Sequence, residues 1–246
     1  MVTKTPELVV TWVALPDDFV LPDDPVDNIQ QPHLAAALND ALGTAGRIQP
    51  DMIIATDFGI VAMINQETVV KAPDWVYVSH VLPIPNAGSR RSYTPNLQGD
   101  PVAVVMEFLS ETEGTEYSVR SSPPFGKMYF YETILQVPTY IIFDPCNPSL
   151  EVRVLHDGRY TLLEPNSEGR YWVSELDLFL GIWQGTRLGI TMDWLRWWDE
   201  AGNLLLWGTE QAEVERQRAE EERQRAEEAI AQLQALQVKM QELGIG

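Results

Sequence analysis

The sequence predicts a domain of mixed helices and strands, an α/β (α+β) fold, followed by a charged C-terminal helix or coiled coil. Three observations lead to this prediction: short apolar runs between turn residues, a stretch where strand, helix and strand patterns follow one another, and a repeated heptapeptide near the C-terminus. The chain has 246 residues, 45% of them hydrophobic, which suffices for one globular domain and an appended element. We expect the domain to span residues 1–209 and the appended helix residues 210–246.

The first third of the chain is expected to form a loop, a helix and several strands. Residues 16–32 are dense in proline and aspartate, which favours an ordered loop. Residues 33–42 place leucine and alanine at helical spacing before Gly43, which predicts a helix. Short apolar runs then predict strands of a single sheet, at residues 52–56, 60–64 and 75–78.

The middle of the chain predicts a crossover unit. A long polar loop at residues 83–101 contains the adjacent Arg90 and Arg91, and loops of this length are often functional. The alternating runs of residues 150–173, separated by DG and NSEG turns, predict antiparallel hairpins. Between these segments, apolar and helical patterns predict a strand, a helix and a second strand, at residues 102–109, 126–135 and 139–143.

The C-terminal segment has a seven-residue period. Residues 215–221 and 222–228 are the same heptapeptide, ERQRAEE, and this period is typical of a coiled coil. Glutamates interrupt the first half of the predicted seam, so self-association is expected only through the last three turns. A solitary charged helix held by Glu/Arg pairs is the alternative. The apolar seam positions are Ala226, Ala229, Leu233, Leu236, Met240 and Leu243.

Composition restricts the possible partners and compartment. The formal net charge of −19 weighs against tight non-specific binding of nucleic acid, because the field of the protein repels polyanions. No run of about 18 apolar residues is present, so we expect no membrane span. The first residues lack a signal-peptide pattern, and the single Cys146 excludes an internal disulfide framework. These features predict a cytoplasmic protein.

The tryptophan-rich segment WLRWW, residues 194–198, has two interpretations. Such a cluster is expected to cover a hydrophobic surface or to make an oligomer contact. The alternative is a platform on which bases of a single strand stack.

An acid within an apolar run is the most informative feature. Glu107 stands in VAVVMEFL, where an ionised carboxylate is costly unless it is paired or metal-bound. Asp74 precedes the strand at 75–78, and Lys127 begins the predicted helix. Two carboxylates from neighbouring strands can hold Mg²⁺ against a phosphate, and an ammonium nearby can orient water. Taken singly, the three residues could instead be a turn aspartate, an acid neutralised by arginine and a solvated lysine.

These residues and their order resemble the Uma-two family of restriction-endonuclease-like proteins, abundant in cyanobacteria, within the PD-(D/E)XK nuclease superfamily. The resemblance covers about residues 25–180, and it extends to His33 before the first helix and to the appended helical tail. The matching pieces are Pro73-Asp74, Glu107 with Leu109-Ser110, Lys127 with Tyr131, Val137-Pro138, Tyr140 and Asp144-Pro145.

The resemblance implies a restriction-endonuclease-like mixed β-sheet flanked by helices, and an endonuclease that hydrolyses phosphodiester bonds in nucleic acid, with DNA as the expected substrate. It implies Asp74, Glu107 and Lys127 as catalytic residues. It also implies a Mg²⁺ or Mn²⁺ ion held by Asp74, Glu107 and the backbone carbonyl of Phe108. The superfamily lysine normally stands two places after the glutamate, where this chain has Leu109, and Lys127 on the following helix matches the migrated lysine of the family.

Candidate substrate contacts lie around these residues. Arg90, Arg91 and Arg120 are the basic residues available to bind phosphate. Tyr131 is expected mainly to pack in the core, and the alternative is that its hydroxyl bonds a phosphate or a ligand carboxylate. We expect a homodimer, possibly formed through the C-terminal helix. Two other hypotheses stay open: a nuclease-fold protein without catalysis, and an assembly module that uses its terminal helix.

Overall fold

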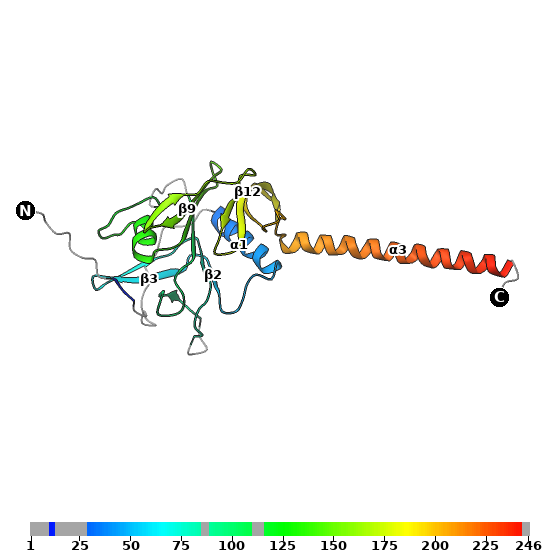
Figure 1. The fold of residues 1–246 in the computed structure, drawn as a ribbon, viewed down its shortest axis with the longest axis horizontal. Coiled ribbons are helices and arrows are strands. Elements are labelled where there is room, and N and C mark those ends of the chain that lie inside the picture. Colours follow the sequence, from blue (N-terminus) through cyan, green and yellow to red (C-terminus); the bar gives the residue numbers. More distant parts are fainter. Residues whose placement is uncertain (1–9, 13–28, 85–88, 110–115, 243–246) are drawn as a thin grey trace, which may run out of the picture. The chain divides into compact units, whose positions relative to one another are not determined.

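The computed structural model describes residues 10–12, 29–84, 89–109 and 116–242 (Figure 1). The chain divides into two compact units, residues 1–205 and 206–246. The sequence-based boundary between residues 209 and 210 stays a prediction. Within the described part of the chain, no helix is both long and apolar enough to cross a bilayer.

A six-stranded mixed sheet forms the centre of the first unit. Only β7 and β8 run parallel, and the other neighbouring pairs are antiparallel. The side chains of β5 and β7 are buried along their whole length, which explains why their sequences are nearly continuous apolar runs. The strand order is β10 (Arg159–Leu162), β9 (Ser149–His156), β8 (Thr139–Asp144), β7 (Val104–Phe108), β5 (Trp75–Val78) and β2 (Ile53–Ala55).

The predicted crossover unit is confirmed. A short α-helix, α2 (Lys127–Tyr129), continues directly as a π-helical segment, η1 (Phe130–Leu135), on the connection between the parallel strands β7 and β8. The helical segment ends at Leu135, and the next residue, Gln136, has left-handed backbone angles with φ of 52°. Its apolar side chains pack into the core that also contains Val105 of β7 and Tyr140 of β8.

A second sheet corrects one prediction. The runs at residues 52–56, 60–64 and 75–78 all form strands, but not in one sheet. The middle run is β3 (Gly59–Ile64), which pairs with β4 (Glu67–Lys71), β1 (Val10–Thr11) and β6 (Ser92–Tyr93). The reason is local, because Asn65 and Gln66 both have positive φ and close a two-residue hairpin that commits β3 to β4.

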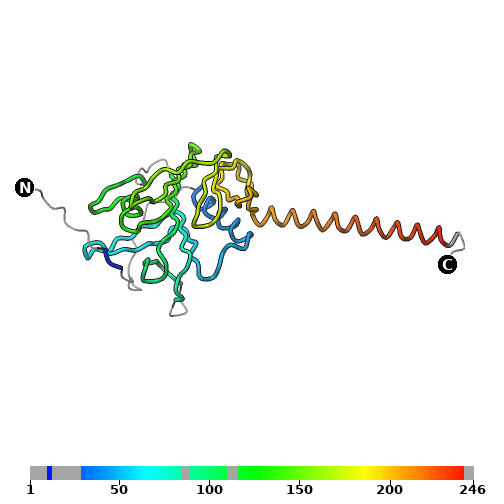
Figure 2. The backbone as a smooth tube through the Cα atoms, viewed as in Figure 1, coloured from blue at the N-terminus to red at the C-terminus, as the bar shows by residue number. Residues whose placement is uncertain are grey.

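The third sheet contains β11 (Tyr171–Val173), β12 (Leu178–Arg187) and β13 (Ile190–Trp198). Helix α1 (Gln30–Thr44), the helix predicted at residues 33–42, packs against β13. Figure 2 shows this blue helix beside the yellow strands, which lie far from it in the sequence. The helix begins at Gln30, so the end of the loop predicted at residues 16–32 is helical, and residues 16–28 lie outside the described residues.

The WLRWW segment is the end of β13 and belongs to the interior. Trp194 and Trp197 are fully buried and Trp198 is 6% exposed, so these rings are not available to stack on bases. The ring of Trp197 lies 6.1 Å from that of Trp75, and the indole of Trp75 donates a hydrogen bond to Asn39 of α1. The segment therefore serves as hydrophobic cover.

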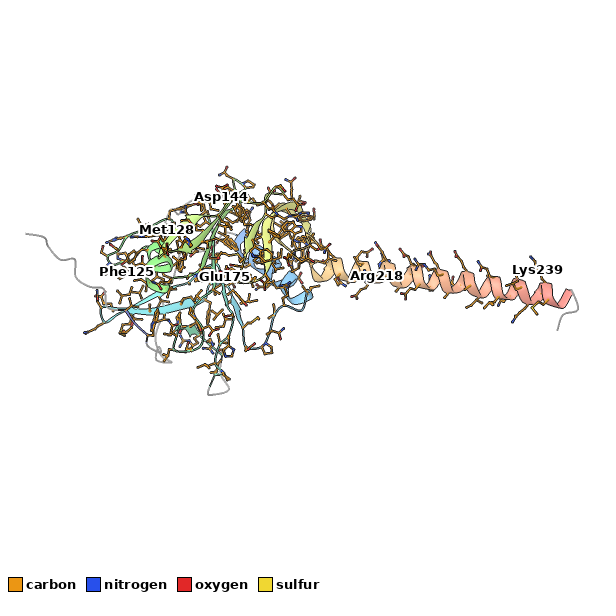
Figure 3. The ribbon with its side chains drawn as sticks, in the orientation of Figure 1. Phe125, Met128, Asp144, Glu175, Arg218 and Lys239 are labelled. Atoms are coloured by element: carbon orange, nitrogen blue, oxygen red, sulfur yellow. The ribbon has the colours of Figure 1, made fainter. Side chains whose placement is uncertain are left out.

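The second unit is dominated by one helix, α3 (Gly208–Glu242). Arg/Glu pairs three and four residues apart run along it, such as Arg216 with Glu213 at 2.7 Å, and Figure 3 shows Arg218 and Lys239 on the same helix. Five large apolar side chains near its C-terminal end are exposed: Ile230, Leu233, Leu236, Val238 and Met240.

Candidate functional site

Sheet register brings Asp74 and Glu107 together. Asp74 is the residue directly before β5, and Glu107 lies in β7, the antiparallel neighbour of β5. Trp75 pairs with Met106, which places Asp74 beside the last residues of β7. One carboxylate oxygen of Asp74 accepts a hydrogen bond from the backbone amide of Phe108. The prediction that two acids meet on neighbouring strands therefore has a direct structural basis.

Glu107 is completely buried, and two side chains from the crossover contact it. The hydroxyl of Tyr131 donates a 2.8 Å hydrogen bond to Oε1, and the ammonium of Lys127 lies 3.2 Å from Oε2. A phosphate or a ligand carboxylate was expected as the partner of the Tyr131 hydroxyl, and in the structure this hydroxyl bonds the carboxylate of Glu107. Because the Tyr131 side chain is fully buried, it is placed to orient Glu107.

The start of the crossover explains why Lys127 points to this place. Phe125 and Met128, both labelled in Figure 3, are buried in the core on either side of Lys127. The ring of Phe125 stacks on Tyr129, with centroids 6.0 Å apart. Because Phe125 and Met128 are held in the core, the side chain of Lys127 is directed at Glu107 and is only 16% exposed.

A third carboxylate, which the sequence analysis missed, also contacts Lys127. Glu116 is 3% exposed, and its Oε1 lies 3.6 Å from the Lys127 ammonium. In the sequence this acid stands in the polar segment SETEGTEYS, where a solvated loop charge is the ordinary expectation. No periodic pattern in that segment distinguishes Glu116 from its neighbours.

Burial governs the electrostatics of the acids. Burial and, after it, the charge of the neighbouring Glu107 raise the pKa of Asp74 to about 8, although the hydrogen bond from the backbone amide of Phe108 opposes the shift. Burial also raises the pKa of Glu107 to about 7, although Lys127 and the Tyr131 hydroxyl oppose the shift. Both acids are thus poised to change charge near neutral pH.

The lysine stays cationic. Burial by itself lowers the pKa of Lys127, but the surrounding carboxylates of Glu107, Asp74 and Glu116 outweigh it and raise the pKa above its ordinary value. Three acids and one ammonium leave an excess of negative charge at the site when the acids ionise. Positive charge from a bound cation would offset this excess.

The donor set fits a hard divalent ion. Mg²⁺ prefers oxygen ligands, keeps several waters and is commonly held by one or two carboxylates, which Asp74 and Glu107 supply. The carbonyl of Phe108, the third predicted ligand, accepts a hydrogen bond of 2.5 Å from Nε2 of Gln31 in α1. Among the described residues no three or more His, Cys, Asp or Glu side chains are grouped to hold a metal, so Glu116 does not complete a three-carboxylate cage.

The predicted arginines occupy different places. Arg120 lies on the segment beside the start of α2, where its backbone carbonyl accepts a 3.0 Å hydrogen bond from the amide of Gly126. Its guanidinium donates to the carbonyl of Pro123 at 2.7 Å. Arg91 is exposed, and the guanidinium of Arg90 donates to the carbonyl of Leu82 at 2.6 Å. Of the three, Arg120 is the one whose backbone bonds to Gly126, the residue directly before the helix of Lys127.

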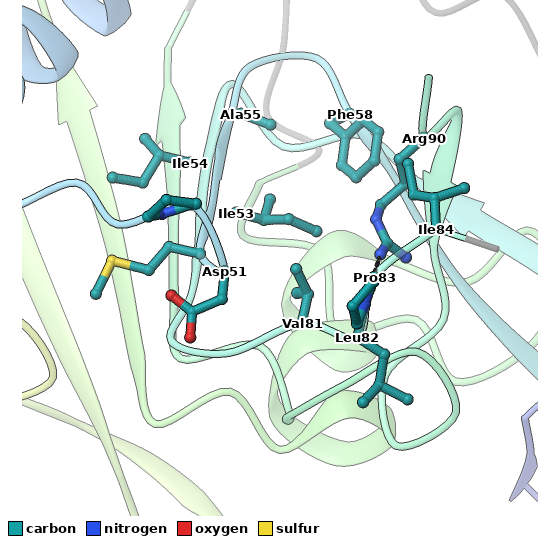
Figure 4. Close-up of a pocket in the computed structure, with 12 residues that line it drawn as sticks. Asp51, Ile53, Ile54, Ala55, Phe58, Val81, Leu82, Pro83, Ile84 and Arg90 are labelled. Carbon is teal, nitrogen blue, oxygen red and sulfur yellow. Dashed lines mark hydrogen bonds between the residues drawn. The ribbon is translucent and has the colours of Figure 1, made fainter. Parts of the chain in front are cut away.

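Arg90 borders a separate apolar pocket next to β2 (Figure 4). The pocket measures about 540 Å³, and Asp51 and Arg90 lie on opposite sides of it. Asp74, Glu107 and Lys127 are not among its lining residues, which are Pro50, Asp51, Met52, Ile53, Ile54, Ala55, Phe58, Val81, Leu82, Pro83, Ile84 and Arg90.

A family model decides the relationship of this chain to known proteins. The model of Uma2, described as "Putative restriction endonuclease", matches residues 19–193. The chain belongs to the Uma2 family. The Uma2 match contains all three acids, Lys127 and Tyr131, and it ends before α3. No curated protein sequence matches the chain. The mixed sheet with its flanking helices agrees with the restriction-endonuclease-like fold that the resemblance implied.

Proposed function

We propose that this Uma2 protein is a metal-dependent endonuclease that hydrolyses phosphodiester bonds, with DNA as its substrate. Membership of a family described as restriction endonucleases supports nuclease activity in general. The observation that supports the finer proposal is that Asp74, directly before β5, lies close to Glu107 of β7 and that Lys127 of the crossover contacts Glu107.

Asp74 and Glu107 would hold a Mg²⁺ or Mn²⁺ ion, with the Phe108 carbonyl as a further oxygen ligand. Such an ion, when bound, polarises a phosphoryl oxygen and lowers the pKa of bound water. The backbone amide of Phe108 holds the Asp74 carboxylate in place, and Tyr131 does the same for Glu107. The Lys127 ammonium supplies hydrogen-bond donors for the attacking water and for charge that develops on the phosphate.

Phosphate binding must overcome the acidic character of the chain. With a net charge of −19, the protein as a whole repels a polyanion, so binding depends on local cations. Arg120, next to the start of α2, is the best placed of the predicted phosphate contacts. We expect activity to fall only moderately with rising salt, because the slope grows with the number of phosphate contacts and few basic residues would make them.

Cleavage assays on plasmid and single-stranded DNA test the proposal. The full chain should cleave in Mg²⁺ or Mn²⁺ and not in chelator, and Asp74→Asn and Glu107→Gln should reduce cleavage to background. Glu132→Gln is the matched control, because Glu132 is also a buried acid in an ion pair, with Arg159 at 3.0 Å. Cleavage that persists in the Asp74 and Glu107 variants, with folding verified by circular dichroism, would reject the assignment.

One observation favours a second candidate, a nuclease-fold protein that binds without cleaving. Lys127 pairs with both Glu107 and Glu116, and such an internal ion pair can keep buried acids in place without a metal. Calorimetric titration separates the two candidates. Failure to bind Mg²⁺ or Mn²⁺ at millimolar concentration would support the non-catalytic protein.

We also propose that the protein forms a homodimer through the last turns of α3. The exposed side chains of Leu233, Leu236 and Met240 supply apolar seam positions on a helix that is otherwise charged. A dimeric nuclease would address both strands of a duplex.

A further inference from the structure

The ammonium of Lys127 lies between two buried carboxylates. It is 3.2 Å from Oε2 of Glu107 and 3.6 Å from Oε1 of Glu116, and these acids are 0% and 3% exposed. The two acids come from different parts of the fold, because Glu107 belongs to β7 and Glu116 to the segment that precedes α2.

Backbone contacts hold the Glu116 segment against the start of the crossover. The amide of Tyr129 donates to the carbonyl of Ser118, and the hydroxyl of Tyr140 donates to the carbonyl of Glu116, at 3.2 and 3.0 Å. Gly126 permits the close approach, since a Cβ there would lie 2.1 Å from the Ser118 carbonyl oxygen. Glu116 is thus placed by the fold and not by chance contact of a surface side chain.

This arrangement answers a problem that the proposed function creates. A cation bound by Asp74 and Glu107 would neutralise the Glu107 carboxylate, which now forms an ion pair with Lys127. The ammonium would then be a mostly buried cation beside another cation, which is unfavourable unless a second anion holds it. Glu116 already contacts the ammonium, with its Oε1 3.6 Å away.

We propose that Glu116 is a positioning residue that holds the Lys127 ammonium when Glu107 takes up a divalent cation. This inference rests on the proposed function. It means that the site would hold two cations at the same time, the divalent ion and the Lys127 ammonium. Glu116 acts through Lys127 and not as a metal ligand, in agreement with the lack of a three-carboxylate group in the described part of the chain.

Calorimetric titration of Mn²⁺ into four full-length proteins tests this: the wild type, Glu116→Gln, Lys127→Met and the double variant. We expect Glu116→Gln to weaken Mn²⁺ binding by about tenfold or more, because the unheld ammonium competes with the ion for Glu107. Lys127→Met removes the competitor and should tighten binding. In that background Glu116→Gln should change the dissociation constant by no more than about twofold. The control Glu132→Gln should bind as the wild type does.

Three results would overturn the inference. Equal weakening by Glu116→Gln with and without Lys127 would mean that Glu116 attracts the ion directly. Unchanged binding in Glu116→Gln would remove any role for it. Absence of Mn²⁺ binding in the wild type would overturn the proposed function as well, so the two failures are distinguishable. If Glu116→Gln does not fold, Glu116→Asp keeps the charge but shortens its reach, and its weaker binding should again disappear in the Lys127→Met background.

Discussion

The carboxylate of Asp74 accepts a hydrogen bond from the backbone amide of Phe108, the residue that follows Glu107 in β7. Because this bond joins a side chain to the backbone of the neighbouring strand, the separation of the two acids depends on the β5–β7 register. A slip of one residue would turn Glu107 to the opposite face of the sheet. The acidic pair is therefore as well defined as the central sheet.

The metal-free protein should lose stability as the pH rises from about 4.5 to about 8.5. Burial raises the pKa of Glu107 to about 7 and that of Asp74 to about 8, so the folded state keeps protons that the unfolded chain has released. Stability that is present below the unfolded pKa, near 4, is lost as pH passes the folded values. The expected slope is about 1.4 kcal/mol per pH unit for each such proton.

Urea denaturation in chelator at a series of pH values measures this slope. Asp74→Asn removes one of the two titrating acids, so the free energy of unfolding of this variant should depend less on pH than that of the wild type. Identical slopes in the two proteins would show that the raised pKa of Asp74 does not govern the pH dependence.

Removing the Tyr131 hydroxyl should destabilise the protein, and more so at high pH. Tyr131→Phe leaves Oε1 of the fully buried Glu107 without this donor, which costs about 1–3 kcal/mol in the free energy of unfolding. The lost bond also lets the pKa of Glu107 rise further, because the hydroxyl favours the ionised form. In urea denaturation the cost should therefore be larger above about pH 8 than at about pH 6.

Tyr160→Phe is the control for this effect. The hydroxyl of Tyr160 donates to the backbone carbonyl of Val137 at 3.0 Å, so its removal costs a hydrogen bond to a group that does not titrate. The loss in free energy of unfolding should be independent of pH in Tyr160→Phe. If it is also independent of pH in Tyr131→Phe, the role of Tyr131 in orienting an ionised Glu107 is contradicted.

Charges on the predicted seam of α3 should lower the oligomeric mass. Leu233→Lys combined with Leu236→Lys places cations at two adjacent seam positions, whereas Val238→Lys adds one at an exposed position on the far side of the same helix. Light scattering should find a smaller mass for the double variant and the wild-type mass for Val238→Lys. The same mass in all three proteins would reject a dimer held by this helix.

The elements that could be predicted from the sequence are those with a strong local pattern. The runs that became β5 and β7 are apolar at nearly every position because both faces of these strands are buried. Glu107 was recognisable for the same reason, since an acid within such a run must have a partner. The partner strand of β3 was not recognised, because the two-residue turn at Asn65 and Gln66 that joins β3 to β4 lacks the glycine that usually marks such a hairpin in a sequence.

Local sequence thus determined the crossover, the buried acid and the lysine that follows it. Only the tertiary structure decided which side chains surround Lys127 and Glu107. Glu116 contacts Lys127 because Gly126 allows a polar segment to pack against the start of α2. Tyr131 contacts Glu107 because the crossover lies over β7. The physical reason is that burial and hydrogen bonding of a polar side chain depend on chain segments distant in sequence, whereas periodicity reports only the face on which an element is apolar.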